Sequence, residues 1–95
     1  MISYHPAVQR DVSAILEYYD NASSRLGDEF WKELEYFLSL AEKSPYRFHY
    51  GLGDMRRANL KRFPYHILFR VIPDGIRVVV VRHHRRHPAH GAKRR

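Results

Sequence analysis

The chain has 95 residues, of which 44% are hydrophobic, and a formal net charge of +7. This length supports one hydrophobic core, so we expect a single domain over residues 1–95. Cysteine is absent, which excludes disulfides, thiolate metal sites and thiol catalysis. No stretch is apolar for long enough to cross a bilayer, and no export signal is recognisable, so we expect a cytoplasmic protein that does not contact a membrane.

The positive charge is confined to the second part of the chain. Residues 1–55 contain five Lys or Arg against nine Asp or Glu, whereas residues 56–95 contain twelve Lys or Arg and a single acid, Asp74. The two parts therefore have net charges of −4 and +11. So local a surplus of cations predicts salt-sensitive attraction to phosphates or to an acidic protein surface.

Two helices are expected in the first part of the chain. A short strand at residues 2–4 precedes Pro6, which suits the first turn of a helix. Apolar residues then recur at helical spacing at Val8, Val12, Ile15, Leu16 and Tyr19, with Arg10, Asp11, Ser13 and Glu17 left for solvent. Residues 20–24 favour a turn, which makes the two helices an antiparallel hairpin.

The second helix shows the same spacing and ends before a proline. Its apolar positions are Leu26, Phe30, Leu34, Phe37, Leu38 and Ala41, and the helix stops at Ser44-Pro45. We expect Phe37 in the core and Tyr18, Trp31 and Tyr36 partly exposed.

Three strands are expected in the second part, after a loop at residues 46–54. Residues 56–62 alternate, with Ala58 and Leu60 on the core face and Arg57, Asn59 and Lys61 on the other. Residues 65–72 alternate in the same way, with Tyr65, Ile67, Phe69 and Val71 on the core face and His66, Leu68 and Arg70 facing away from the core. Residues 76–81 form a β-branched run after the turn signal at 73–75. Residues 83–95 are too polar for a core element and predict a partly mobile basic tail.

These elements predict an α+β fold. An N-terminal strand and an antiparallel helical hairpin pack on one face of a C-terminal antiparallel β-sheet. The basic side chains of the strands are expected on the other face.

Several short runs, taken in their order along the chain, are similar to one known family. They are Tyr4-His5-Pro6-Ala7, Tyr18-Tyr19, Phe30, the run LKRFPYHILFRV from Leu60 to Val71, and the run VVRHHRRHP from Val80 to Pro88. Together they resemble the RelE/ParE superfamily of toxins from type II toxin-antitoxin (plasmid stabilisation) systems, closer to the ParE-like branch. One departure is His87, which stands where that branch usually has Asp. The resemblance implies a growth-inhibiting toxin that a cognate antitoxin neutralises.

The resemblance leaves two kinds of target open, because some relatives cut messenger RNA in the ribosome and others bind DNA gyrase without chemistry. In the RNA-cutting members, lysines, arginines and a tail tyrosine do the work. Aligned on the sheet, Arg57 and Asn59 fall at the lysine positions, His66 and Arg86 at the arginine positions, and Ala92 at the tyrosine. Only Arg57 and Arg86 keep the charge, which argues against a ribonuclease of this pattern.

A further ribonuclease branch uses a histidine near its carboxyl terminus, and His83 or His84 matches that role. The catalytic alternative is therefore an mRNA endoribonuclease using Arg57, His66, His84 and Arg86. For the same histidines, packing at the strand end or solvation of a basic tail is the simpler interpretation.

Our leading hypothesis is a toxin that acts by binding. The residues expected to contact the target or an acidic antitoxin are Arg57, Lys61, Arg62, Arg70, His83, Arg85 and Arg86. A degenerate toxin or a small RNA-binding protein is the remaining alternative.

No metal and no cofactor are expected. His83, His84, His87 and His90 are potential ligands, but interleaved arginines oppose a cation, and neither cysteine nor a nearby carboxylate completes the set.

Overall fold

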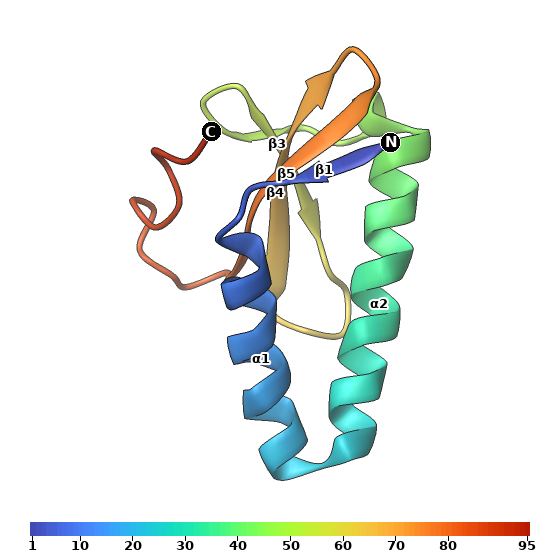
Figure 1. The fold of residues 1–95 in the computed structure, drawn as a ribbon, viewed down its shortest axis with the longest axis vertical. Coiled ribbons are helices and arrows are strands. Elements are labelled where there is room, and N and C mark those ends of the chain that lie inside the picture. The colour runs from blue at the N-terminus through green and yellow to red at the C-terminus, as the bar shows by residue number, and fades with distance from the viewer.

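The computed structural model describes residues 1–95. In chain order its elements are β1 (Ile2–Tyr4), α1 (Val8–Ala22), α2 (Ser24–Lys43), the short 3-10 helix η1 (Pro45–Arg47), β2 (Tyr50–Leu52), β3 (Met55–Asn59), β4 (Tyr65–Ile72) and β5 (Gly75–His83). The predicted α+β class is confirmed, with a helical hairpin on one face of the sheet (Figure 1).

The sheet has five strands in the order β1-β5-β4-β3-β2. The β3–β4 and β4–β5 pairs are antiparallel, as expected, and the predicted turn joins β4 to β5. The predicted opening strand is confirmed, and it pairs in parallel with β5, Ile2 lying opposite Ile76. This pairing places the first strand of the chain beside the last strand, and both run in the same direction. The start of α1 therefore lies close to the segment that follows β5.

The hairpin turn is tighter than the predicted break at residues 20–24. Helix α1 continues to Ala22 and α2 starts at Ser24, so Ser23 alone leaves the helical conformation, with φ −170° and ψ 130°. At Gly27 an added Cβ would meet the Asp20 carboxylate. The missing side chain thus leaves room for the Asp20 side chain, near the end of α1, against the first turn of α2.

The main core lies between the hairpin and the sheet. Both helices contribute the predicted residues, among them Ile15, Phe30 and Leu34, and the sheet contributes Ile67, Phe69 and Val78. Phe37 is buried as predicted, and Tyr18, Trp31 and Tyr36 are exposed. The helical spacing of the sequence therefore locates this core correctly.

The segment predicted as a plain loop, residues 46–54, contains structure. The end of η1 and the edge strand β2 lie within it. Arg56 on β3 holds the segment: its guanidinium lies 5.0 Å from the ring centroid of Tyr46 and 4.3 Å from that of Tyr50, and it donates to the Phe48 carbonyl at 2.7 Å. Strand β2 was missed because alternating apolar residues do not mark it. The contacts of Arg56 hold its segment against β3 instead.

The second face of the sheet differs from the prediction of a purely basic surface. Met55, Leu68, Val79 and Val80 form a second buried apolar cluster there. The register of β4 against β5 shifts between Leu68 and Phe69, so that Val79 is an extra residue in β5. This bulge brings two successive valines to the second face, where strict alternation would leave one.

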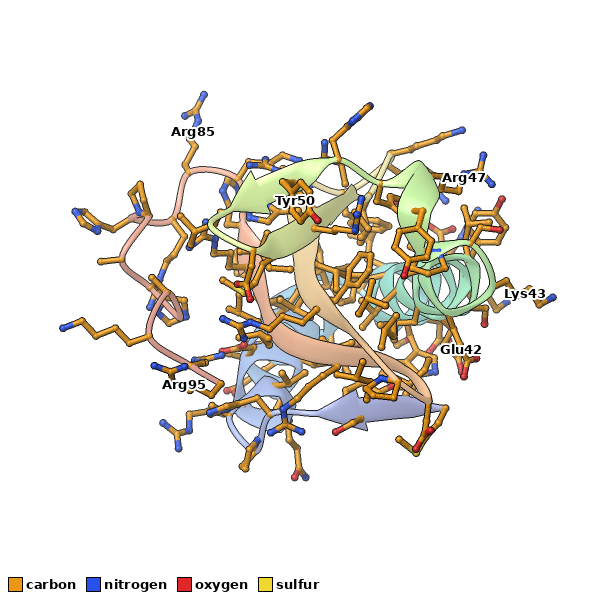
Figure 2. All side chains as sticks on the ribbon, turned by 90° about the horizontal axis from the view of Figure 1, so that it is seen from above. Glu42, Lys43, Arg47, Tyr50, Arg85 and Arg95 are labelled. Carbon is orange, nitrogen blue, oxygen red and sulfur yellow. The ribbon has the colours of Figure 1, made fainter.

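The tail, residues 84–95, covers that second cluster. Figure 2 shows the sheet between α2 on one side and the tail on the other. Gly91, at φ +77°, sits so close to Val80 that an added Cβ would lie 2.9 Å from the valine side chain. Arg94 then pairs with Asp11 of α1, with 2.6 Å between Nη1 and Oδ2. The sequence predicted a partly mobile tail and did not foresee these contacts.

Neither helix combines the length and the apolar character that crossing a bilayer demands.

Candidate functional site

Four cationic or imidazole side chains meet at the end of the sheet where β3, β4 and β5 lie side by side. Arg57 is on β3, His66 on β4, Arg82 on β5, and His84 directly after β5. The strand register causes this, because His66 pairs with Asn59 on one side and with Arg82 on the other. Arg82 Nε lies 3.0 Å from His66 Nε2, His66 Nδ1 lies 3.0 Å from His84 Nδ1, and Arg57 Nη2 lies 3.2 Å from the same His84 atom.

The arginines determine where the imidazole protons lie. Arg82 Nε–H can only donate, so His66 Nε2 must be the acceptor and its proton sits on Nδ1. His66 Nδ1–H then donates to His84 Nδ1, which also receives the Arg57 guanidinium. His84 consequently has its own proton on Nε2. Both lone pairs that could accept a proton are already occupied inside this network.

Both histidines are held in their neutral form. Burial is the main cause that lowers the pKa of His66 to about 3, and the charges of Arg57 and Arg82 add to it. Burial, followed by Arg57, also lowers the pKa of His84. His66 is only 1% exposed, which contradicts its predicted place on a solvent-facing strand surface. The tail covers that surface, and hydrogen bonds to Arg82 and His84 satisfy both ring nitrogens.

Arg82 links this network to the tail. Its Nη1 donates to the carbonyls of Pro88 and His90 at 3.0 and 2.8 Å. Although Arg82 is 7% exposed, no carboxylate lies within ion-pair distance of it. Asp11 lines the same pocket as Arg82, but its carboxylate accepts from both Arg94 Nη groups and from the Val81 amide.

The structure brings together three of the four residues named for the ribonuclease alternative. Hydrogen bonds join Arg57, His66 and His84, whereas Arg86 Nη2 lies 3.4 Å from His90 Nδ1 and no hydrogen bond joins Arg86 to the other three. Asn59, at one of the family's lysine positions, accepts from Arg57 Nε at 2.7 Å. Ala92 lies in the tail directly after Gly91, the residue that sits against Val80.

The other residues named for binding are spread over the sheet and its loops. Glu33 accepts from the backbone amides of Lys61 and Arg62, and the Arg62 side chain pairs with Glu29 at 2.9 Å. The Arg62 guanidinium is the main cause that lowers the pKa of Glu29. This basic loop is thereby attached to α2 and lies apart from the histidine network.

Arg70, His83 and Arg85 complete that set. Arg70 Nε pairs with Asp54 at 3.1 Å, and its Nη1 donates to the Arg94 carbonyl, so it too supports the tail. His83 Nδ1 accepts the Arg85 amide. The Arg85 side chain points away from the molecule into solvent (Figure 2).

Three important residues were missed from the sequence: Arg82, Asp11 and Arg94. Asp11 was assigned to solvent, yet its side chain is 6% exposed. A signal existed, since Asp11 lies three residues after Val8 and four before Ile15, both buried, and so falls on the apolar face of α1. Nothing local marks Arg94 as its partner, because 83 positions separate the two residues.

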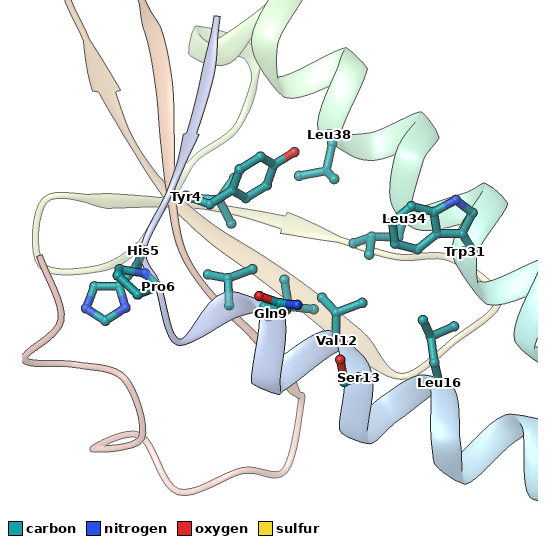
Figure 3. Close-up of a pocket in the computed structure, with 13 residues that line it drawn as sticks. Tyr4, His5, Pro6, Gln9, Val12, Ser13, Leu16, Trp31, Leu34 and Leu38 are labelled. Atoms are coloured by element: carbon teal, nitrogen blue, oxygen red, sulfur yellow. The ribbon is translucent and has the colours of Figure 1, made fainter.

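An apolar groove lies on the opposite side of α1, where the hairpin meets β1. Tyr4, Trp31, Leu34 and Leu38 form one wall and Val12 and Leu16 the other (Figure 3). Trp31 is 43% and Tyr4 47% exposed. This groove contains no charged side chain, in contrast to the network at the sheet end.

The clustered histidines do not form a group of three side chains that could hold a metal ion. His66 and His84 stack with their rings within 5° of parallel, and each has an arginine beside it. Two cations at this distance would repel a third.

Comparison with known proteins adds two findings. The family model described as "ParE toxin of type II toxin-antitoxin system, parDE" matches residues 2–88. A solved structure of the chromosomal ParDE TA system from P. aeruginosa is similar, with a TM-score of 0.73 over 86% of this chain and 92% of that chain at 15% sequence identity. At that identity the likeness establishes the fold. No curated protein matches the chain.

Proposed function

Since the chain belongs to the ParE toxin family of type II toxin-antitoxin systems, we propose that it inhibits growth by binding a target protein, with DNA gyrase the first candidate, and that it does not cut RNA. The observation that supports this proposal is the closed hydrogen-bond network of His66 and His84. A histidine that acts as a general base needs a free lone pair facing the substrate. In His84 that lone pair, on Nδ1, already faces Arg57 and His66.

Membership of this family implies an antitoxin partner. We propose that the antitoxin uses an acidic segment that orders on the basic sheet and tail. The candidate contacts are four residues whose side chains make no ion pair within the chain: Arg57, Lys61, Arg85 and Arg86. Salt should then weaken the complex, and Arg85→Ala should weaken it more than Arg25→Ala, which removes an exposed arginine already paired with Glu29.

One observation favours the ribonuclease as the second candidate. Arg57 lies beside exposed His84, which places a positive charge next to an imidazole as cleavage by a 2′-hydroxyl requires. Protonated Nε2 of His84 is available as a hydrogen donor, but a separate base is then required. Arg86, which was expected to complete the site, is directed to His90.

The two candidates are separated by induced expression in a bacterial host. Messenger RNA integrity and gyrase-dependent DNA supercoiling are followed in parallel from the moment of induction. The proposal predicts loss of supercoiling with intact transcripts. Rapid transcript cleavage with unchanged supercoiling would contradict it, and so would unaffected growth, which is the behaviour of a degenerate toxin.

A further inference from the structure

A second groove runs between α1 and the tail, and of the residues that line it only Arg86 is among the proposed antitoxin contacts. Its walls come from opposite ends of the sequence: Arg10 and Tyr18 belong to α1, whereas Arg86 and His90 belong to the tail. Tyr65 and His83, at the paired ends of β4 and β5, also line it. The Asp11–Arg94 pair crosses from one wall to the other and holds the groove in shape.

The inner end of this groove contains an incompletely paired cation. Arg82 is only 7% exposed. Its Nε donates to His66 Nε2, and its Nη1 donates to the carbonyls of Pro88 and His90. Nη2 makes no hydrogen bond within the chain. Every fully buried polar side-chain atom of the protein has a partner, so Nη2 must be accessible to solvent. Arg82 thus lines the groove with one guanidinium nitrogen, Nη2, that has no partner within the chain. A cation this buried is stabilised by an anion brought to it.

The single carboxylate of the groove is not that anion. Asp11 accepts from Arg94 Nη1 at 2.6 Å, from Arg94 Nη2 at 3.1 Å and from the Val81 amide at 3.2 Å. Its charge is balanced by Arg94. Of the arginines around the groove, Arg10, Arg82 and Arg86 remain without a carboxylate partner.

We infer that this groove binds the phosphodiester backbone of a nucleic acid. Arg10 and Arg86 are exposed on opposite rims, and Arg82 stands at the inner end, so three guanidinium groups face one channel. Guanidinium groups match the geometry of phosphate oxygens. The inference goes beyond the proposed function, since it concerns a nucleic acid and not the target protein.

Two features favour a nucleic acid over an acidic peptide as the occupant. The cations continue past the groove, because residues 84–95 contain five Lys or Arg and no acid, as a long and regularly charged polymer requires. Aromatic rings also line the same channel. Tyr18 is 68% exposed, and the Tyr65 ring meets His83 edge to face with centroids 5.1 Å apart. The Tyr65 ring is packed against core rings, whereas the exposed ring of Tyr18 offers a surface on which a base can stack.

The test is fluorescence anisotropy with two labelled probes, a 20-base-pair DNA duplex and a single-stranded RNA of 20 nucleotides, across a range of salt. The variant is Arg10→Ala/Arg86→Ala. The matched control is Arg25→Ala/Arg47→Ala, which removes the same charge from two exposed arginines away from the groove. The control separates a phosphate site from the general attraction of a chain with charge +7.

The groove variant should weaken binding of at least one probe roughly tenfold and reduce the salt slope by about 2, because two phosphate contacts are lost. The control should change binding less than about twofold. Arg10→Ala alone, on the exposed face of α1, should show about half the change in slope and remain folded even if the double variant does not. Which probe responds distinguishes DNA from RNA.

Three results would overturn the inference. Equal weakening by the groove and control variants would show that net charge alone attracts the probe. If neither the DNA nor the RNA probe bound at low salt, a nucleic acid would be excluded as the occupant of the groove. An acidic peptide such as oligoglutamate is the third probe. The groove would be assigned to a protein partner if the groove variant lost binding of this peptide and bound both nucleic-acid probes as the unsubstituted protein does. Each result is independent of whether gyrase is inhibited, which the expression assay measures separately.

Discussion

The two faces of the sheet are built on different principles. The hairpin face buries fifteen apolar residues in one cluster, and aromatic rings such as Tyr19, Phe30 and Phe63 pack within 6 Å of one another there. The tail face buries only Met55, Leu68, Val79 and Val80, and around them charged and imidazole groups are joined by hydrogen bonds. The first face depends on burial of area and the second on matched polar partners.

This difference explains which face carries the candidate sites. An apolar core stabilises the fold but provides no group that can bind a charged partner. A polar network beneath a short tail places charged groups close to solvent. The histidine network lies on the tail face, and the cationic groove lies where the tail meets α1. Substitutions on the two faces should therefore differ in their effect on the free energy of unfolding.

The largest effect is expected for Phe30→Ala on the hairpin face. Phe30 is 0% exposed and packs between Tyr19, Phe63 and Tyr65, so its removal leaves a cavity and should cost about 4 kcal/mol of unfolding free energy. Urea unfolding followed by circular dichroism measures it. Trp31→Ala, next in sequence but 43% exposed, should cost less than half as much. Equal costs would mean that the hairpin core is not arranged as described.

Asp11→Asn should have the next largest effect, and it acts on the tail face. The amide cannot balance the charge of Arg94, whose side chain is 17% exposed, so we expect a loss of about 2–3 kcal/mol. Limited proteolysis should also cut the tail faster, because its attachment to α1 is lost. Glu17→Gln, on the exposed side of the same helix, serves as the control. Unchanged proteolysis of the tail would contradict the role given to Asp11.

Gly91→Ala should cost about 1–2 kcal/mol, because the residue has φ +77° and its Cβ would press on Val80. Gly53→Ala is the matched control, since Gly53 also has a positive φ, +56°, but nothing lies within 4 Å of an added Cβ. The difference between the two unfolding free energies measures how closely the tail seats on the sheet. If the two variants were equally stable, the tail would not be seated there.

The smallest effect is expected from acid near neutrality. The folded pKa of His66 is about 3 and its ordinary value is 6.5, so the unfolded chain binds the proton between these values and stability falls as pH decreases through this range. One such histidine costs about 0.7 kcal/mol between pH 7 and pH 6, and more at lower pH. His66→Gln should flatten the pH dependence of the urea midpoint, whereas His49→Gln, an exposed residue, should not. The same slope in both would rule out His66 as its source.

Sequence patterns predicted the hairpin face well and the tail face poorly, for a physical reason. Helical spacing at residues such as Phe30 and Leu34, and alternation at Ile67 and Phe69, record burial directly in the order of residues. The β1–β5 pairing and the Asp11–Arg94 contact join residues more than 70 positions apart, so no local pattern marks them.

The candidate site shows the same limit. The family resemblance singled out Arg57, His66 and His84, and the structure joins them, but alternation alone placed His66 in solvent. His66 is on the predicted face of β4, but Arg82 and His84 pack against its ring and the tail held by Arg82 covers that face. Arg82 was overlooked because an arginine after a run of valines is typical of a strand that emerges into solvent. Its burial depends on His66 Nε2 and on the carbonyls of Pro88 and His90, which no local pattern marks as its partners.

The most direct measurement is growth inhibition by His84→Asn in an inducible host, with folding confirmed by thermal unfolding. Asn Oδ1 can replace His84 Nδ1 as the acceptor for Arg57 and His66, but it cannot transfer a proton at neutral pH. The binding account predicts growth inhibition within about twofold of the unsubstituted protein. Loss of inhibition in a folded variant, accompanied by loss of messenger RNA cleavage, would contradict the account and identify His84 as a catalytic residue.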